Sequence, residues 1–133
     1  MSELKKVTDY LRVTVEHGGS DLHLSSGAPP AARVDGTLKP LEEFCLNDEV
    51  CKSLIMDTLT EAQRTELEKN WELDYAIQVG DVGRFRGNVH YTRGHVEASF
   101  RYIPTDIPDL ASLGHYPIIE EICQLRRGLI LLT

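Results

Sequence analysis

The sequence has 133 residues, of which 41% are hydrophobic and 26% charged, and its formal net charge is −7. This length supports one domain with its own core, and the hydrophobic content excludes a disordered chain. The negative charge argues against a nucleic-acid partner, and no apolar run approaches the roughly 20 residues that a membrane helix needs. The N-terminus lacks the apolar block of a signal peptide, so we expect a cytoplasmic protein without membrane insertion.

The first part of the chain predicts a helix followed by three short strands. Apolar side chains recur at three- and four-residue intervals from Leu4 to Val15, as in an amphipathic helix. Alternation of polar and apolar residues then indicates strands, and Asp35-Gly36 is a strong hairpin signal between the last two. The predicted strands are residues 20–25, 31–34 and 37–41.

Two further helices and three longer strands are predicted next. Asn47 is placed to cap the first helix, and a capping box that begins at Thr60 opens a mostly polar helix that ends near Asn70. A period of two then returns in residues 72–79, 84–91 and 96–102. The sequence therefore predicts an α+β fold, in which an antiparallel sheet of about six strands is covered by helices on one face.

The best domain boundary lies at Pro104, where a stiff, proline-containing segment begins. A helix is predicted from Pro117 to Leu125. The wholly apolar run of residues 129–132 is typical of a strand buried on both faces of a parallel sheet. We therefore divide the chain into a domain of residues 1–103, a linker of residues 104–116 and the start of a second domain at residues 117–133.

The arginines of residues 84–103 are the strongest candidate site residues. This segment holds four arginines and one acid, whereas residues 42–81 hold eleven acids and three bases. A turn at Arg93-Gly94 places every apolar side chain of the last hairpin on one face and sets Arg86 directly opposite Arg101. Like charges so placed destabilise a sheet. They are tolerated if they bind an anion such as phosphate, or if Glu97 or acids from a neighbouring strand neutralise them.

Other reactive residues form no recognisable set. Asp21 and His23 alternate onto the polar side of one strand, but no third partner is placed, so we expect a solvated strand face and neither a metal site nor a catalytic site. Three cysteines cannot all pair and show no C-x-x-C spacing, so we expect reduced thiols, with Cys51 in the core.

Several motifs, in order and spread over nearly the whole chain, resemble the PilT-like motor ATPases of type IV pili. Each motif alone is weak, and the ordered set is specific. The motifs are Ser20-Asp21-Leu22-His23-Leu24, Pro29-Pro30, Arg33-Val34-Asp35-Gly36 with Leu38, Glu72-Leu73-Asp74, Arg84-Phe85-Arg86-Gly87-Asn88-Val89, Phe100-Arg101-Tyr102-Ile103-Pro104 and Arg127-Gly128-Leu129-Ile130-Leu131-Leu132-Thr133.

The resemblance implies a PAS-like N-terminal domain, a linker and the first strand of a RecA-like motor domain. It implies a parent protein that binds ATP and Mg²⁺, assembles into a homohexamer through RecA-like domains of its own and neighbouring subunits, and acts in the cytoplasm, peripheral to the inner membrane, with pilus platform proteins. In that family, arginines of the N-terminal domain contact the nucleotide phosphates. The matching positions are Arg86 and Arg101, with Arg93 less securely placed.

The sequence departs from the full family pattern because it contains no G-x-x-x-x-G-K-[ST] phosphate-binding loop, no acidic metal-holding strand and no catalytic glutamate. We therefore expect a chain cut before that loop, which has no ATPase activity, binds no cofactor and forms no hexamer by itself. The short stretch before the first motif favours a retraction motor. The alternatives are the same domain of a pilus-assembly or type II secretion ATPase, and a free-standing PAS-like module that binds a ligand or a protein.

Overall fold

The computed structural model describes residues 5–131 and 133. Within them, helices alternate along the chain with two groups of three strands. The helices are α1 (Val7–Glu16), α2 (Asp48–Met56), α3 (Glu61–Asn70) and α4 (Ile118–Cys123). The strands are β1 (Asp21–Leu24), β2 (Ala31–Val34), β3 (Thr37–Pro40), β4 (Glu72–Val79), β5 (Gly83–Thr92) and β6 (His95–Ile103). The six strands form one antiparallel sheet in the order β3-β2-β1-β6-β5-β4, which confirms the predicted α+β fold.

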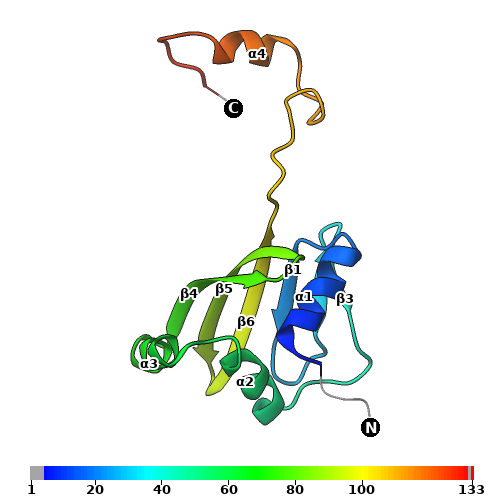
Figure 1. Ribbon diagram of the computed structural model, residues 1–133, viewed down its shortest axis with the longest axis vertical. Helices are drawn as coiled ribbons and strands as arrows, with labels where there is room; N and C mark the ends of the chain where they lie inside the picture. Colours follow the sequence, from blue (N-terminus) through cyan, green and yellow to red (C-terminus); the bar gives the residue numbers. More distant parts are fainter. Residues whose placement is uncertain (1–4, 132) are drawn as a thin grey trace.

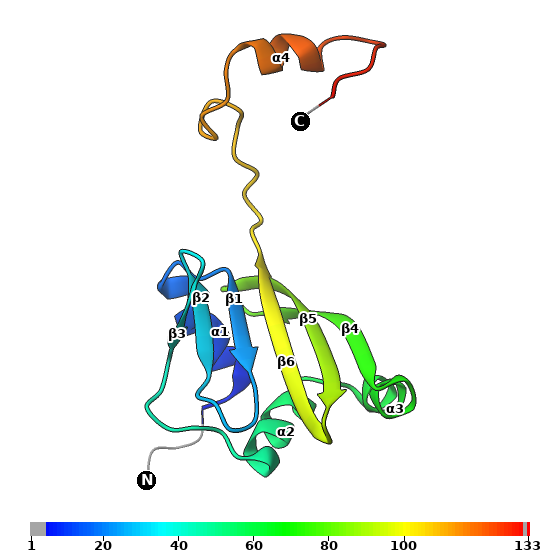
Figure 2. The ribbon, with the colours of Figure 1, turned by 180° about the vertical axis from the view of Figure 1, so that it is seen from behind.

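Helices α1 and α2 lie on one face of the sheet, and α3 lies beside β4 at the end of the sheet (Figure 1). The core is formed between this face and the helices, where Tyr10, Leu22, Phe85 and Phe100 are almost wholly buried. The opposite face carries the polar residues of β4, β5 and β6, and no helix of the described residues covers it when the sheet is seen from behind (Figure 2). The sheet therefore presents one packed face and one open, polar face.

Local signals in the sequence explain where the helices begin. The Asn47 side chain accepts a hydrogen bond from the Val50 amide at 2.9 Å, which caps α2 as predicted. Thr60 and Gln63 form the predicted capping box of α3, with reciprocal bonds of 3.3 and 2.9 Å. In the described residues, no helix is long and apolar enough to cross a membrane.

The chain leaves the sheet after Ile103, and α4 lies apart from the sheet in both views (Figures 1 and 2). The strand predicted for the terminal apolar run is not formed: Leu129, Ile130 and Leu131 are exposed and belong to no strand, while Leu132 lies outside the described residues. A buried strand needs a neighbouring strand for its backbone hydrogen bonds, and no strand of the described chain lies beside this run. Ile107 and Tyr116 also remain more than 80% exposed.

Gly87 allows two aromatic rings to meet inside the sheet. It lies in the middle of β5, directly between Tyr75 of β4 and Phe100 of β6, whose rings pack edge to face at 6.3 Å. A Cβ atom at residue 87 would lie 2.8 Å from the Tyr75 ring and 3.2 Å from the Phe100 ring. The absence of a side chain is therefore required by space, because this glycine has an ordinary strand conformation.

Replacing Gly87 with Ala should lower the free energy of unfolding by about 1–3 kcal/mol, because the added methyl group overpacks the two rings. Urea unfolding followed by circular dichroism measures this change. Ser99→Ala, on the open face of the neighbouring strand, serves as the control and should change stability by less than about 0.5 kcal/mol. Equal stability of the Gly87→Ala variant and the parent chain would show that the rings can move apart at no cost.

Candidate phosphate-contact site on the open sheet face

The polar side chains of the open face form rows that run across the strands. The first row, here called the arginine row, has its members directly paired from β2 to β5: Arg33, Asp21, Arg101 and Arg86. The second row, two residues along each strand, consists of His23, Ser99, Asn88 and Asp74. The third row consists of Glu97, His90 and Glu72. The face therefore changes from mainly cationic to acidic over three rows.

The predicted register of the last hairpin is confirmed, since Arg86 pairs directly with Arg101 and Phe85 with Tyr102. Arg93 is not brought to this pair. It lies in the turn between β5 and β6 with a φ of 50°, seven residues beyond Arg86, which corresponds to roughly 23 Å along an extended strand. Of the three arginines predicted to contact phosphate, the fold thus brings together Arg86 and Arg101 alone.

Each arginine of the central pair has a carboxylate partner on its outer side. The Nε atom of Arg101 donates to Oδ1 of Asp21 at 2.8 Å, and Nη2 of Arg86 donates to Oδ2 of Asp74 at 3.4 Å. Glu97 instead lies 3.8 Å from His90. Acids from the neighbouring strands β1 and β4 therefore neutralise the pair, which the sequence left as an alternative, and Glu97 does not take part.

The expectation that Asp21 lies on a solvated face is wrong. Its side chain is only 8% exposed, because Arg101 from β6 and Arg33 from β2 flank it, the latter at 3.9 Å, and the Ser20 hydroxyl donates to it at 2.6 Å. Burial opposes the charge of Asp21, but the hydrogen bonds from Ser20 and Arg101 outweigh it, so the pKa of this carboxyl lies below its ordinary value. Asp21 is therefore ionised at neutral pH.

His23 lies beside Ser99 in the second row and is half buried. Its Nε2 atom is buried without a hydrogen-bond partner among the described residues. Burial and the nearby positive charge of Arg33 lower the pKa of the imidazole, so His23 is neutral at pH 7. The side chain therefore adds no charge to the face under physiological conditions.

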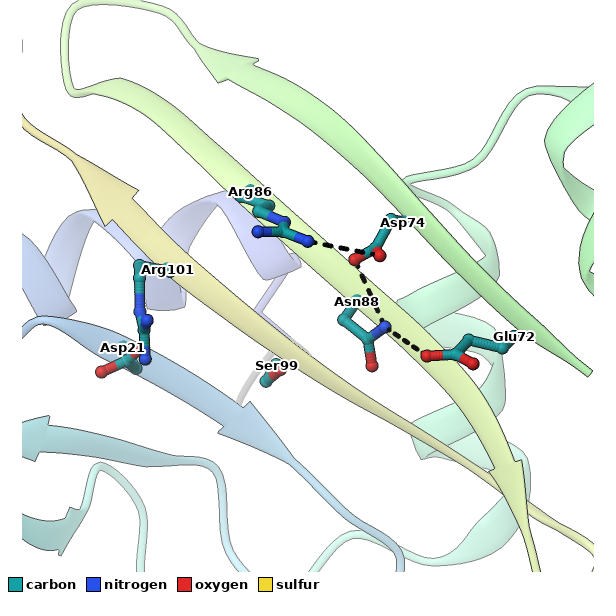
Figure 3. Close-up of a pocket in the computed structure, with 7 residues that line it drawn as sticks. All are labelled: Asp21, Glu72, Asp74, Arg86, Asn88, Ser99 and Arg101. Carbon is teal, nitrogen blue, oxygen red and sulfur yellow. Dashed lines mark hydrogen bonds and ion pairs between the residues drawn. The ribbon is translucent and has the colours of Figure 1, made fainter.

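The central pair and its surroundings line a shallow pocket with a volume of about 390 Å³. Figure 3 shows the two guanidinium groups on neighbouring strands, each next to a carboxylate group. The lining residues are Asp21, Glu72, Asp74, Arg86, Asn88, Ser99 and Arg101.

The pocket has the donors for an oxyanion but not an excess of positive charge. Within the described residues, Arg101 makes no hydrogen bond through its two Nη atoms, and Arg86 makes none through Nε or Nη1. These donors can bind a phosphate in the planar geometry that arginine provides. Three carboxylates face the same pocket, however, and they weaken its attraction for an anion.

The described residues favour neither a metal site nor a nucleophilic thiol. No group of three or more His, Cys, Asp or Glu side chains is arranged to hold a metal ion in residues 5–131 and 133. Cys51 is buried in the core as predicted, its thiol lies 3.5 Å from the Val96 carbonyl oxygen, and burial raises its pKa to about 11. This thiol is therefore a packing residue and not a nucleophile.

Comparison with known proteins finds relatives that are similar over most of the chain, whereas no protein-family model matches it. The chain is 35% identical over 121 residues to the type IV pilus ATPase PilU of Pseudomonas aeruginosa, and 34% identical over 127 residues to the type IV pilus retraction ATPase PilT of the same organism. These alignments cover 91% and 96% of the chain. A crystal structure of the pilus retraction motor PilT with bound ADP matches 91% of the chain, with a TM-score of 0.77 and 39% identity.

The chain is PilT-like. It spans only 32% and 37% of the lengths of the two Pseudomonas proteins, and 36% of the PilT crystal structure. The ATPase DotB of Legionella pneumophila shares the fold, with a TM-score of 0.64 and 23% identity. The family resemblance inferred from the ordered motifs is thus confirmed over nearly all of the PilT-like chain.

The two central arginines of the PilT-like chain should contribute differently to stability. Arg101→Ala leaves the buried Asp21 without its closest cationic partner and should lower the free energy of unfolding by about 1–3 kcal/mol. Arg86→Ala removes a solvent-exposed pair and should change it by less than about 0.5 kcal/mol. Chemical denaturation of both variants measures the difference, and equal effects would show that Asp21 is not held by Arg101.

The Arg101→Ala effect should depend on pH. A carboxyl whose folded-state pKa is lowered stabilises the fold fully above its unfolded-state pKa, and this contribution is lost as the pH falls through the folded-state pKa. The stability difference between the parent chain and Arg101→Ala should therefore be constant near neutral pH and shrink below about pH 4. Urea unfolding at several pH values tests this, and a difference that persists undiminished in acid would exclude Asp21 as its source.

Proposed function

We propose that this chain is the N-terminal domain of a type IV pilus retraction motor, in which Arg86 and Arg101 contact the phosphates of the nucleotide that the motor domain holds. The observation that carries this proposal is the pairing of two guanidinium groups with unused N–H donors on an open sheet face, in a chain related to PilT. A surface of this kind becomes useful when another domain brings a phosphate to it.

The fold supports a division of the chain into the domain of residues 1–103, the linker of residues 104–116 and the beginning of a RecA-like motor domain at residues 117–133. The sheet ends at Ile103, and the apolar residues that follow it are largely exposed. Leu129 and Leu131, for example, are 82% and 75% exposed. Side chains of this kind are expected to be covered, and the remainder of a motor domain would cover them.

The mechanism follows from the chemistry of arginine. The guanidinium groups place fixed positive charge and donors where the β- and γ-phosphates carry negative charge, so closure of the domain depends on the nucleotide that is bound. ATP and Mg²⁺ belong to the motor domain, because the P-loop that would bind them is not in this sequence. In the cell we place the motor as a cytoplasmic homohexamer at the inner membrane, acting on pilus platform proteins.

A pilus-assembly or type II secretion ATPase could contain the same domain, and a free-standing PAS-like module remains the alternative from a different class. The codons that follow Thr133 distinguish the motor proteins from the module. A glycine-rich loop ending in Gly-Lys-Ser or Gly-Lys-Thr supports a motor protein, and its absence from the continuing gene supports a binding module.

In the longer protein, Arg101→Ala should lower steady-state ATP turnover, by about 10³-fold if the arginine acts on the transferring phosphate and by less if it senses bound nucleotide. Arg101→Lys should restore turnover only in part, because lysine lacks the planar fork. Arg84→Ala is the matched control, since Arg84 is exposed on the same strand face and has no assigned role. Turnover of Arg101→Ala equal to that of the control would refute the proposed role.

A further inference from the structure

Arg101 and Arg86 are held by their carboxylates in very different ways. Asp21 is 8% exposed and binds Nε of Arg101 at 2.8 Å, whereas Asp74 is 52% exposed and reaches a terminal nitrogen of Arg86 at 3.4 Å. An exposed pair with long geometry contributes little and fixes no orientation, but a buried carboxylate with a short bond does fix one. The two acids beside the pocket are therefore not equivalent.

Asp21 is itself fixed from several directions. The Ser20 hydroxyl donates to its Oδ2 atom at 2.6 Å, and Nε of Arg33 lies 3.9 Å from the same atom. Its backbone is held between β2 and β6 by the pairing of Asp21 with Arg33 and Arg101. An acceptor held in this way leaves Arg101 few orientations in which the bond to Nε survives.

The choice of the Nε atom has a consequence for the rest of the guanidinium group. When Nε–H is bound to Asp21, both Nη atoms stay available, and the side chain of Arg101 is 73% exposed. A phosphate can then bind the two Nη atoms without displacing Asp21. At Arg86, in contrast, Asp74 binds one of the terminal nitrogens, which is a position that a phosphate would also use.

We propose that Asp21 is a positioning residue that orients Arg101 toward a phosphate group, whereas Asp74 competes with that phosphate for Arg86. The inference rests on the proposed function, since it assumes that the central arginine pair binds phosphate. For Asp21, the predicted effect on binding is opposite to the effect expected from charge alone. Replacement of either carboxylate by an amide removes one negative charge beside the pocket, which by Coulomb's law alone should strengthen the binding of any anion.

The test measures binding of inorganic tripolyphosphate to the 133-residue chain at low salt, by NMR shifts of the arginine Nε–H signals. Asp74→Asn should bind about twofold to fivefold more tightly than the parent chain, because one screened repulsion is removed. Asp21→Asn should bind more weakly than the parent chain in spite of the same change in charge. Asp21→Glu, which keeps the carboxylate that the amide of Asn lacks, should recover part of the loss.

Tighter binding by both Asn variants overturns the positioning role and leaves the phosphate site intact. If Arg101→Ala and Arg86→Ala both bind tripolyphosphate as well as the parent chain does, the phosphate site itself is refuted.

A measurement on the parent chain needs neither a variant nor an anion. It tests whether Asp21 holds Arg101 even if Asp21→Asn does not fold. The Nε–H proton of Arg101 should exchange with water more slowly than that of Arg84, for which the described residues provide no hydrogen-bond acceptor. Equal exchange rates would show that Asp21 does not hold Arg101 in solution, and they would overturn the inference.

Discussion

The pairing of β1 with β6 is the interaction on which the rest of the structure depends. It joins two antiparallel units, β1-β2-β3 and β4-β5-β6, into one sheet, although Asp21 and Arg101 are 80 residues apart in the sequence. On the packed face the same pairing sets Leu22 against Phe100, both fully buried. On the open face it sets Asp21 against Arg101. The core and the candidate site are therefore two sides of one strand contact.

In this arrangement two directly opposed arginines each have a carboxylate partner, which offsets their mutual repulsion. In the free chain, each guanidinium group is balanced by an acid from the strand on its outer side, Asp21 for Arg101 and Asp74 for Arg86. The balance is uneven, since one acid is buried and the other exposed. A phosphate that another domain brings to this face would replace Asp74, the weakly held partner of Arg86. At Arg101 it would bind beside Asp21, which stays in place. The binding energy would depend on that domain, which suits a contact that reports the nucleotide state.

Local features of the sequence predicted much of this fold. The caps at Asn47 and Thr60 and the register of the β5–β6 hairpin were all predicted, because each depends on residues close together in the chain. The register alone was enough to place Arg86 opposite Arg101. The ordered motifs added the family, which the relatives confirm over nearly the whole chain.

Features that depend on distant contacts could not be predicted in the same way. The alternation of β1 showed that Asp21 and His23 share the polar side, but only the pairing with β6 and β2 shows that Asp21 is buried between two arginines. Arginines that are close together in the sequence also need not be close in space, since Arg93 lies in the turn of the hairpin, away from Arg86. The apolar run at residues 129–132 is predicted as a strand from its composition, yet a strand requires a neighbour, and residues 5–131 and 133 provide none beside this run.

The proposed role of Arg86 and Arg101 is to contact the phosphates of the nucleotide that the motor domain holds. The most direct measurement is a structure of the longer protein with a non-hydrolysable ATP analogue bound. In that structure we expect the Nη atoms of Arg101 and a terminal nitrogen of Arg86 to lie within hydrogen-bond distance of phosphate oxygens, while Nε of Arg101 keeps its bond to Asp21. A closed, nucleotide-bound structure in which neither arginine reaches a phosphate would contradict it.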